Sequence, residues 1–246
     1  MSYDKPPPWL SPNAVSRRTL LGAAFGALAS DIFSPPRNAS AAAGSALVVF
    51  VHIDSKLRLL QTALEKQLPG TSVRTFSRFG DVRGAMASAD AVLALAPVVA
   101  SLGVSVAKSG VRSGKVTEPY SLVSTDASVK PSNVSKVGFV DILGRRETTS
   151  FVQKIVGGSA QVERVTKLQD LLPLLQLKMA QAILVPTRLV PAFREQTRMQ
   201  LHDTPAPNEI PLPVVGASSA AGRRIADKLQ GANASLNNLL GVQSWR

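Results

Sequence analysis

The stretch ALVVFVHI, residues 46–53, decides the fold class of this chain. It is a continuous run of apolar and β-branched residues with one histidine near its end. Such a run is typical of a strand that is buried on both faces, as in a parallel sheet covered by helices. The residues that follow it repeat leucine at the spacing of one helix face, at Leu57, Leu60, Leu64 and Leu68. We therefore predict a strand that leads directly into a helix.

The same alternation continues through most of the chain. Stretches that predict strands lie at residues 72–79, 91–102, 117–125, 137–143, 160–166, 182–186 and 210–218. Segments with helical patterning lie between or after them, at residues 80–91, 144–158, 168–181, 187–196 and 219–241. Strands that alternate with helices predict a parallel sheet in an α/β fold. The alternation pauses at residues 130–135 and then restarts, which suggests two lobes.

The N-terminal residues have the pattern of an export signal. Arg17 and Arg18 precede an apolar run at residues 20–29, which is too short to span a bilayer. Small residues follow it and offer an Ala-x-Ala cleavage site at residues 39–41. The paired arginines and their neighbours resemble the twin-arginine export signal. We predict that residues 1–41 are a removable signal peptide read by the twin-arginine machinery and that the mature protein is periplasmic. The alternative is a buried N-terminal helix.

Composition and charge exclude several classes of function. The 28 Lys and Arg residues against 16 Asp and Glu give a net charge of +12, but they form no block and few aromatic residues accompany them. We therefore expect no nucleic-acid partner. The chain has no cysteine, which excludes disulfides, thiolate catalysis and Cys-ligated zinc. His52 and His202 have no metal-pair spacing and no flanking nucleophile motif, so we expect no metal, no cofactor and structural or solvent-facing histidines.

A more local pattern is the segment VRSGKVTEPYSLV, residues 111–123. It resembles a segment of the periplasmic type II solute-binding proteins, the receptors of many ABC importers. In that family an Arg precedes a hydrophobic-Ser/Thr-x-Pro-Tyr stretch, with Phe as the usual hydrophobic residue. Here the matching positions hold Arg112, Val116, Thr117, Pro119 and Tyr120.

The resemblance implies a two-lobed, type II periplasmic-binding-protein-like fold, in which each lobe is a mostly parallel sheet flanked by helices. The first lobe would comprise residues 46–130, with residues 205–246 returning to it, and the second lobe residues 131–204. A ligand would lie in the cleft between the lobes, where hinge closure buries it.

Candidate ligand-binding residues lie where strands end and helices begin, since free N–H groups and a partial positive charge are available there. Arg112 is implied by the resemblance, because the family's matching Arg holds a ligand carboxylate. The residues chosen from the strand-to-helix loops are Asp54, Ser55, Arg145, Thr148, Thr149, Ser150 and Thr187. The alternative for the loop residues is helix capping or a solvated loop, and for Arg112 a surface position.

These observations predict an exported, non-catalytic solute-binding protein that captures a small, anionic ligand for transport or sensing. The resemblance implies an inner-membrane ABC permease or a sensor as its partner. One alternative is an envelope protein-interaction module of the same fold without a small ligand; a cleft-facing Arg112 would favour ligand binding over it. The other is a periplasmic hydrolase-type enzyme, against which the missing nucleophile–base motif argues.

Overall fold

The first apolar stretch forms strand β1 (Ser45–Phe50), as its sequence predicts. In the computed structural model, which describes residues 45–52 and 57–246, β1 pairs in parallel with β2 (Thr71–Thr75) and with β3 (Ala91–Leu95). Successive residues of β1 point to opposite sides, so Val48 packs into one hydrophobic core and Leu47 and Val49 into another. The predicted burial of this strand on both faces is confirmed.

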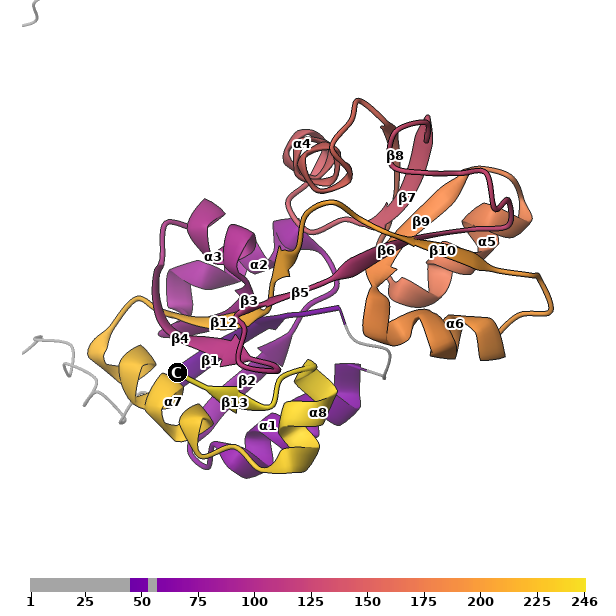
Figure 1. The fold of residues 1–246 in the computed structure, drawn as a ribbon. Coiled ribbons are helices and arrows are strands. Elements are labelled where there is room, and N and C mark those ends of the chain that lie inside the picture. The colour runs from indigo at the N-terminus through magenta and orange to yellow at the C-terminus, as the bar shows by residue number, and fades with distance from the viewer. Residues whose placement is uncertain (1–44, 53–56) are drawn as a thin grey trace, which may run out of the picture. The chain divides into compact units, whose positions relative to one another are not determined.

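The first sheet is mixed, because late segments of the chain return to it. Its order is β13-β4-β12-β3-β1-β2, and β12 (Pro213–Ala217) lies antiparallel between β3 and β4 (Ser105–Val111). Figure 1 shows this late strand, in orange, among the indigo and magenta strands of the early chain. The short strand β13 (Ser244–Trp245) pairs with β4 at the edge.

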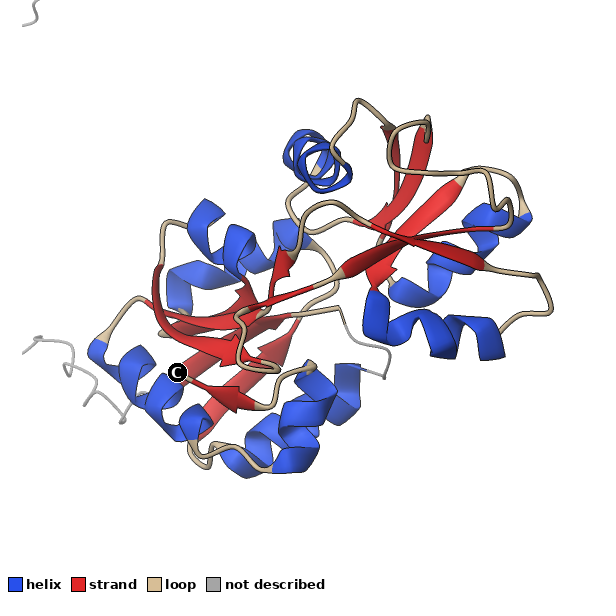
Figure 2. Cartoon of the chain, viewed as in Figure 1, coloured by secondary structure: helices blue, strands red, loops and turns tan. Residues whose placement is uncertain are grey.

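Helices cover both faces of the first sheet (Figure 2). One face packs against α1 (Leu57–Gln67), α7 (Ala220–Gln230) and α8 (Ala234–Leu240). The other packs against α2 (Phe79–Ala85), which continues into η1 (Met86–Ser88), and against α3 (Ala96–Ser101). The single helix predicted for residues 219–241 is wrong: the chain breaks at Gly231, and the Asn233 side chain accepts a hydrogen bond from Leu236 N at 2.9 Å to cap α8.

Helix α7 approaches the first sheet closely at Gly222. A Cβ at this position would lie 2.0 Å from the carbonyl oxygen of Asp90, which is backbone and cannot turn away. We expect Gly222→Ala to lower the free energy of unfolding by about 1–3 kcal/mol, the cost of overpacking. Urea denaturation checks this, with Gly231→Ala as the matched control, because a Cβ there meets only Lys228 O at 3.8 Å. Equal stability of the two variants would contradict the close approach.

The second sheet has the order β10-β6-β9-β7-β8. Its parallel strands are β7 (Lys136–Val140), β8 (Gln161–Val165) and β9 (Ala182–Pro186), while β6 (Tyr120–Ser124) runs antiparallel to both β9 and β10 (His202–Pro205). Its helical segments are α4 (Arg145–Val156), η2 (Leu168–Asp170), α5 (Leu171–Gln176), η3 (Thr187–Leu189) and α6 (Val190–Glu195). Helix α4 ends at Gly157, whose left-handed backbone (φ 78°) matches the predicted stop.

The chain passes between the sheets through a two-stranded ribbon of β5 (Thr117–Glu118) and β11 (Ile210–Pro211). The sequence places residues up to 130 in the first lobe, but β6 already belongs to the second sheet. The polar stretch after β6, which the sequence suggested as the boundary between lobes, connects β6 to β7 within the second sheet. A polar connector of this composition looks the same in sequence whether it joins two lobes or two strands of one sheet. The division into lobes is otherwise still a prediction.

The α/β fold class is confirmed, with mixed sheets flanked by helices. The strand predicted at residues 91–102 ends at Leu95, because α3 begins there with a proline in its first turn. Strands β4 and β10 were missed, since their sequences, SVAKSGV and HDTP, lack an apolar run. No helix within residues 45–52 and 57–246 is long and apolar enough to cross a bilayer. The predicted signal at residues 1–41 and the candidates Asp54 and Ser55 lie outside the described residues.

Candidate functional site

A small pocket lies where the carboxyl ends of strands from both sheets meet. His52 follows β1, Ile142 follows β7 and Arg188 follows β9. Glu118 lies on β5, and Tyr120 is the first residue of β6. Ten of its fourteen lining residues are apolar, and its volume is about 40 Å³. A cavity of this size holds only a few water molecules. The pocket is therefore mostly apolar, with four polar side chains.

Two of the polar side chains form a buried ion pair. Arg188 Nε donates to Glu118 Oε2 at 2.9 Å, and the two side chains are 24 % and 5 % exposed. Glu118 is fixed on β5 by pairing with Ile210, and Arg188 is carried by η3 at the end of β9. Burial raises the pKa of Glu118, and the positive charges of Arg188 and Arg112 oppose this shift. The pair places one negative and one positive group side by side in an apolar setting.

His52 supplies the third polar group. Its Nε2 atom is buried and has no hydrogen-bond partner among the described residues. The ring packs edge-on against Phe50, with centroids 4.9 Å apart. Burial lowers the pKa of His52 to about 4, with a smaller opposing effect from Asp141, so the imidazole is neutral at pH 7. In the sequence, this histidine is distinguished only by its place near the end of the apolar run at residues 46–53.

The predicted residue Arg112 does not line the pocket. It is half-buried, and its Nη1 donates to the carbonyl oxygen of Gly241, at the end of α8, at 3.1 Å. Its positive charge still acts on Glu118, where it opposes part of the rise in pKa that burial causes. Arg112 therefore neither projects into bulk solvent nor faces the pocket, and its role in binding is still a prediction.

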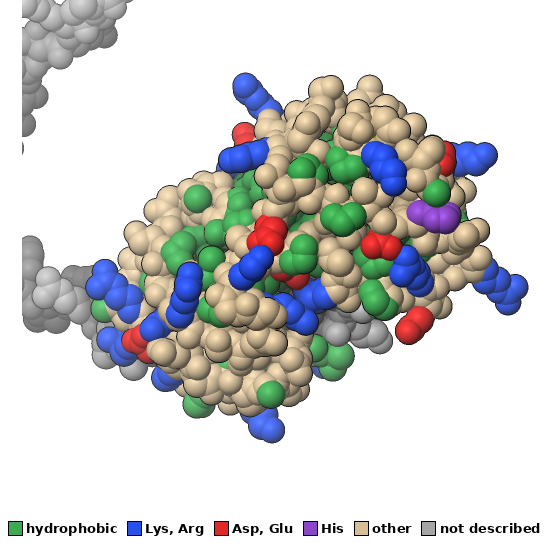
Figure 3. Space-filling view, in the orientation of Figure 1, with side chains coloured by type: hydrophobic (Ala, Val, Ile, Leu, Met, Phe, Trp, Pro, Cys, Tyr) green, Lys and Arg blue, Asp and Glu red, His purple; other side chains and the backbone are tan. Residues whose placement is uncertain are grey.

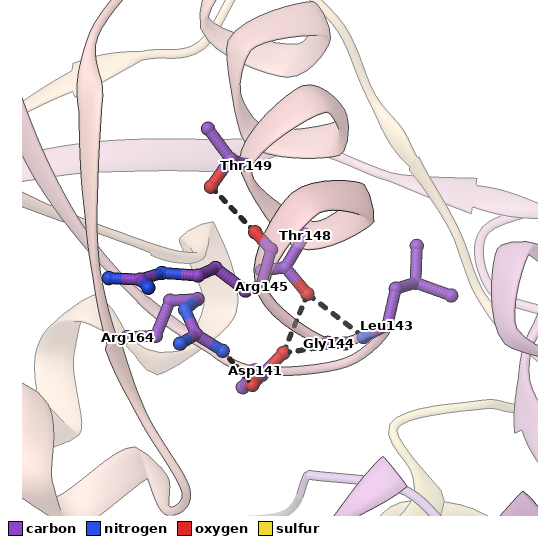
Figure 4. A network of polar contacts seen from close by, with 7 residues as sticks. All are labelled: Asp141, Leu143, Gly144, Arg145, Thr148, Thr149 and Arg164. Atoms are coloured by element: carbon purple, nitrogen blue, oxygen red, sulfur yellow. Dashed lines mark hydrogen bonds and ion pairs between the residues drawn. The ribbon is translucent and has the colours of Figure 1, made fainter. Parts of the chain in front are cut away.

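The loop before α4 is organised by Asp141 (Figure 4). Its carboxylate accepts hydrogen bonds from Gly144 N at 2.8 Å, from Thr148 Oγ1 at 2.8 Å and from Arg164. Thr148 is fully buried and its hydroxyl also accepts from Leu143 N at 2.9 Å. The protein's own carboxylate thus occupies the start of the helix, where we expected a ligand.

The other predicted residues of α4 bond locally or face solvent. Thr149 Oγ1 donates to the carbonyl oxygen of Arg145 at 2.8 Å, a contact within the helix that Figure 4 shows turned away from Asp141. Arg145 and Ser150 are exposed. None of the four α4 candidates is among the pocket-lining residues, and their part in binding is still a prediction.

Thr187 lies beside the pocket and holds one of its walls in place. Its hydroxyl shares a hydrogen bond of 2.9 Å with Ser121 Oγ, and its backbone N–H donates to Pro119 O at 3.0 Å. These bonds fix η3 against β6, so they position Arg188. The sequence singled out Thr187 and the TEPY segment, but it selected neither Arg188, the residue after Thr187, nor Glu118, which lies inside that segment.

A second, larger and more open hollow of about 460 Å³ lies at the start of β4, and Arg223 is the one charged side chain among its described lining residues. On the face drawn in Figure 3, Lys and Arg side chains are spread out, with Asp and Glu among them. Within the part of the chain that the structure describes, no group of three or more His, Asp or Glu residues could hold a metal ion.

No protein-family model and no curated protein matches the sequence. Solved structures do match. The substrate binding protein of an amino acid ABC transporter has a TM-score of 0.53 and 13 % identity, covering 79 % of this chain and 98 % of its own. A double mutant of the Bordetella pertussis BvgS VFT2 domain has a TM-score of 0.55 and 11 % sequence identity, covering 80 % of this chain and 92 % of its own. The GluR0 ligand binding core in complex with L-glutamate has a TM-score of 0.52 and 14 % sequence identity, covering 80 % of this chain and 92 % of its own.

Identities this low show the fold alone. The chain has the α/β architecture of the two-lobed, periplasmic-binding-protein-like structures that it matches.

Proposed function

We propose that the chain is an exported solute-binding protein that takes a small zwitterion of the α-amino acid class into the pocket. The observation that carries this proposal is the buried Glu118–Arg188 ion pair in a mostly apolar pocket. A ligand carboxylate would bind Arg188, and a ligand ammonium group would bind Glu118.

Charge balance favours a zwitterion over an anion. With His52 neutral, the pocket's two charged lining groups sum to zero. A zwitterion gives each of them a partner, whereas an anion on Arg188 leaves Glu118 without its counter-charge, and buried unpaired charges are costly. The start of α4, the other place expected to take an anion, is occupied by Asp141. The proposal therefore replaces the anionic ligand expected from the sequence.

The matched structures support the same class of solute. They include a substrate binding protein of an amino acid ABC transporter, an ancestral arginine-binding protein bound to arginine and a ligand binding core bound to L-glutamate. These are binding proteins and receptor domains, in keeping with a non-catalytic role. In the described chain His52 Nε2 also receives no hydrogen bond from a hydroxyl, which a nucleophile–base pair needs.

Binding requires the pocket to enlarge, because its volume of about 40 Å³ holds only a few waters. The β5–β11 ribbon is where the chain crosses, and we propose that it is the hinge for this opening. A solute that binds the closed form more tightly than the open form then shifts the equilibrium towards closure. Export through residues 1–41 with Arg17 and Arg18, a periplasmic location, and an ABC permease or sensor as partner belong to the same proposal.

Thermal denaturation with a panel of neutral α-amino acids, inorganic phosphate and acetate tests the proposal. We expect at least one amino acid to stabilise the protein, by about 2.7 kcal/mol at a concentration of 100 Kd, and the anions to have no effect. Glu118→Gln should weaken binding of that amino acid about 10- to 150-fold, the loss of one charge-assisted hydrogen bond.

The matched control is Glu163→Gln, which removes a partly exposed carboxylate of β8 that pairs with Lys136 of β7. It should bind as the parent does. If phosphate or acetate stabilises the protein and no amino acid does, the zwitterion proposal is wrong. If no solute binds, the pocket's small volume favours the alternative of an envelope protein-interaction module.

A further inference from the structure

We propose that His52 is a specificity-determining residue that recognises an uncharged hydrogen-bonding group, a hydroxyl or a carboxamide, on the side chain of the bound solute. This inference rests on the proposed function, because it assumes that Glu118 and Arg188 bind the ammonium and carboxylate groups. Beyond the proposed function, it specifies which kind of amino-acid side chain the pocket selects.

The first argument is the unpartnered nitrogen. His52 Nε2 is buried without a hydrogen-bond partner among the described residues, and it lines the pocket. Leaving such an atom unpaired forfeits the hydrogen bond that it makes to water in the unfolded chain, and native proteins rarely keep one without a reason. A ligand group that donates to or accepts from Nε2 removes this cost in the bound state.

The second argument is that the other charged groups are already assigned. Glu118 and Arg188 bond to each other and are matched to the two charges of a zwitterion. The walls around them are apolar, with Leu95, Phe139 and Leu184 among the lining residues. Two polar lining residues remain, His52 and Tyr120, and it is His52 that carries the buried atom without a hydrogen-bond partner in the described chain, so we assign His52 to the rest of the solute.

The third argument concerns charge. An imidazole that is neutral at pH 7 offers no counter-charge to an ammonium, guanidinium or carboxylate on the solute side chain. Placing such a charge against apolar walls and a neutral ring is unfavourable. A hydroxyl or carboxamide, in contrast, can satisfy Nε2 and needs no counter-charge.

Titration calorimetry with pairs of similar shape tests the inference: threonine against valine, and asparagine against leucine. We expect the unmodified protein to bind the polar member of at least one pair about tenfold or more tightly, since a site built for a hydrogen bond rejects the analogue that lacks it. His52→Leu should abolish or reverse this preference, and His52→Asn, which keeps a hydrogen-bonding side chain, should retain part of it.

His202→Leu is the matched control, because His202 lies on β10, outside the pocket, and should leave the preference unchanged. If the unmodified protein binds amino acids with no such preference, or if His52→Leu keeps it, the inference is wrong while the proposed function stands. If the unmodified protein binds no amino acid, the proposed function fails and the inference fails with it. Should His52→Leu not fold, the unmodified protein and His52→Asn still decide the outcome.

Discussion

Replacing Arg188 with methionine is expected to lower the free energy of unfolding by about 3–5 kcal/mol. Methionine preserves much of the apolar stem of arginine but removes the guanidinium that donates to Glu118. The Glu118 side chain, only 5 % exposed, is then left as a buried carboxylate without its ion-pair partner. Removing one member of a buried pair is costly because the other charge loses its compensation.

Chemical denaturation measures this effect, and Arg194→Met is its control. Arg194 pairs with Asp203, but its side chain is 50 % exposed, so we expect its loss to cost about 0–1 kcal/mol. The double variant Glu118→Gln/Arg188→Met should recover part of the stability, since it removes the uncompensated charge as well. Equal costs for Arg188→Met and Arg194→Met would show that the pocket ion pair does not contribute as a buried pair.

Lowering the pH from 7 to 4 is expected to lower the free energy of unfolding by about 3 kcal/mol through His52 alone. The pKa of His52 is about 4 in the folded protein, because burial disfavours the charged ring, against 6.5 for an unperturbed histidine. As the pH falls below about 6.5, the unfolded chain binds a proton that the folded chain does not. Stability is therefore lost between pH 6.5 and 4, and the loss levels off below pH 4, where the folded protein also binds the proton.

Denaturation at pH 7 and at pH 4 in the unmodified protein and in His52→Leu isolates this contribution. The comparison is needed because the raised pKa of Glu118 acts with the opposite sign and favours the folded state as the pH falls. The variant should lose about 3 kcal/mol less than the unmodified protein over this interval. Equal losses would show that His52 is not kept neutral by burial.

The sequence predicted the elements whose hydrophobic pattern is local. The run at β1, the leucine spacing of α1 and the glycine stop of α4 each reflect residues adjacent in the chain. Strand β4 was missed because its sequence, SVAKSGV, mixes small, polar and isolated apolar residues without an apolar run, and the strand is held in place by pairing with β12 and β13. The sheet to which β6 belongs was also missed, because strand pairing over long distances leaves no local pattern.

The candidate site was harder to predict, because its residues come from distant parts of the chain. His52, Glu118 and Arg188 meet only after both sheets have formed. Position after a strand can be read from the sequence, and it marked the loops around Thr148 and Thr187. The sequence does not show which side chain turns into the pocket. Thr148 donates a hydrogen bond to Asp141, seven residues earlier, and the side chain that lines the pocket is that of Arg188.

The crossing ribbon has a consequence for protein engineering. Residues 120–205, which contain every strand of the second sheet, leave the first sheet and return to it at a single place. The two ends of this segment are neighbours: Ala206 N donates to Tyr120 O at 2.8 Å, and Ser121 pairs with Pro205. The segment can therefore be exchanged as one cassette with only two splice points, as in other domain insertions between adjacent chain ends. Because Arg188 lies inside the cassette and His52 and Glu118 lie outside it, such chimaeras would recombine the two halves of the pocket on a constant first sheet and, under the proposed function, would change the ligand preference.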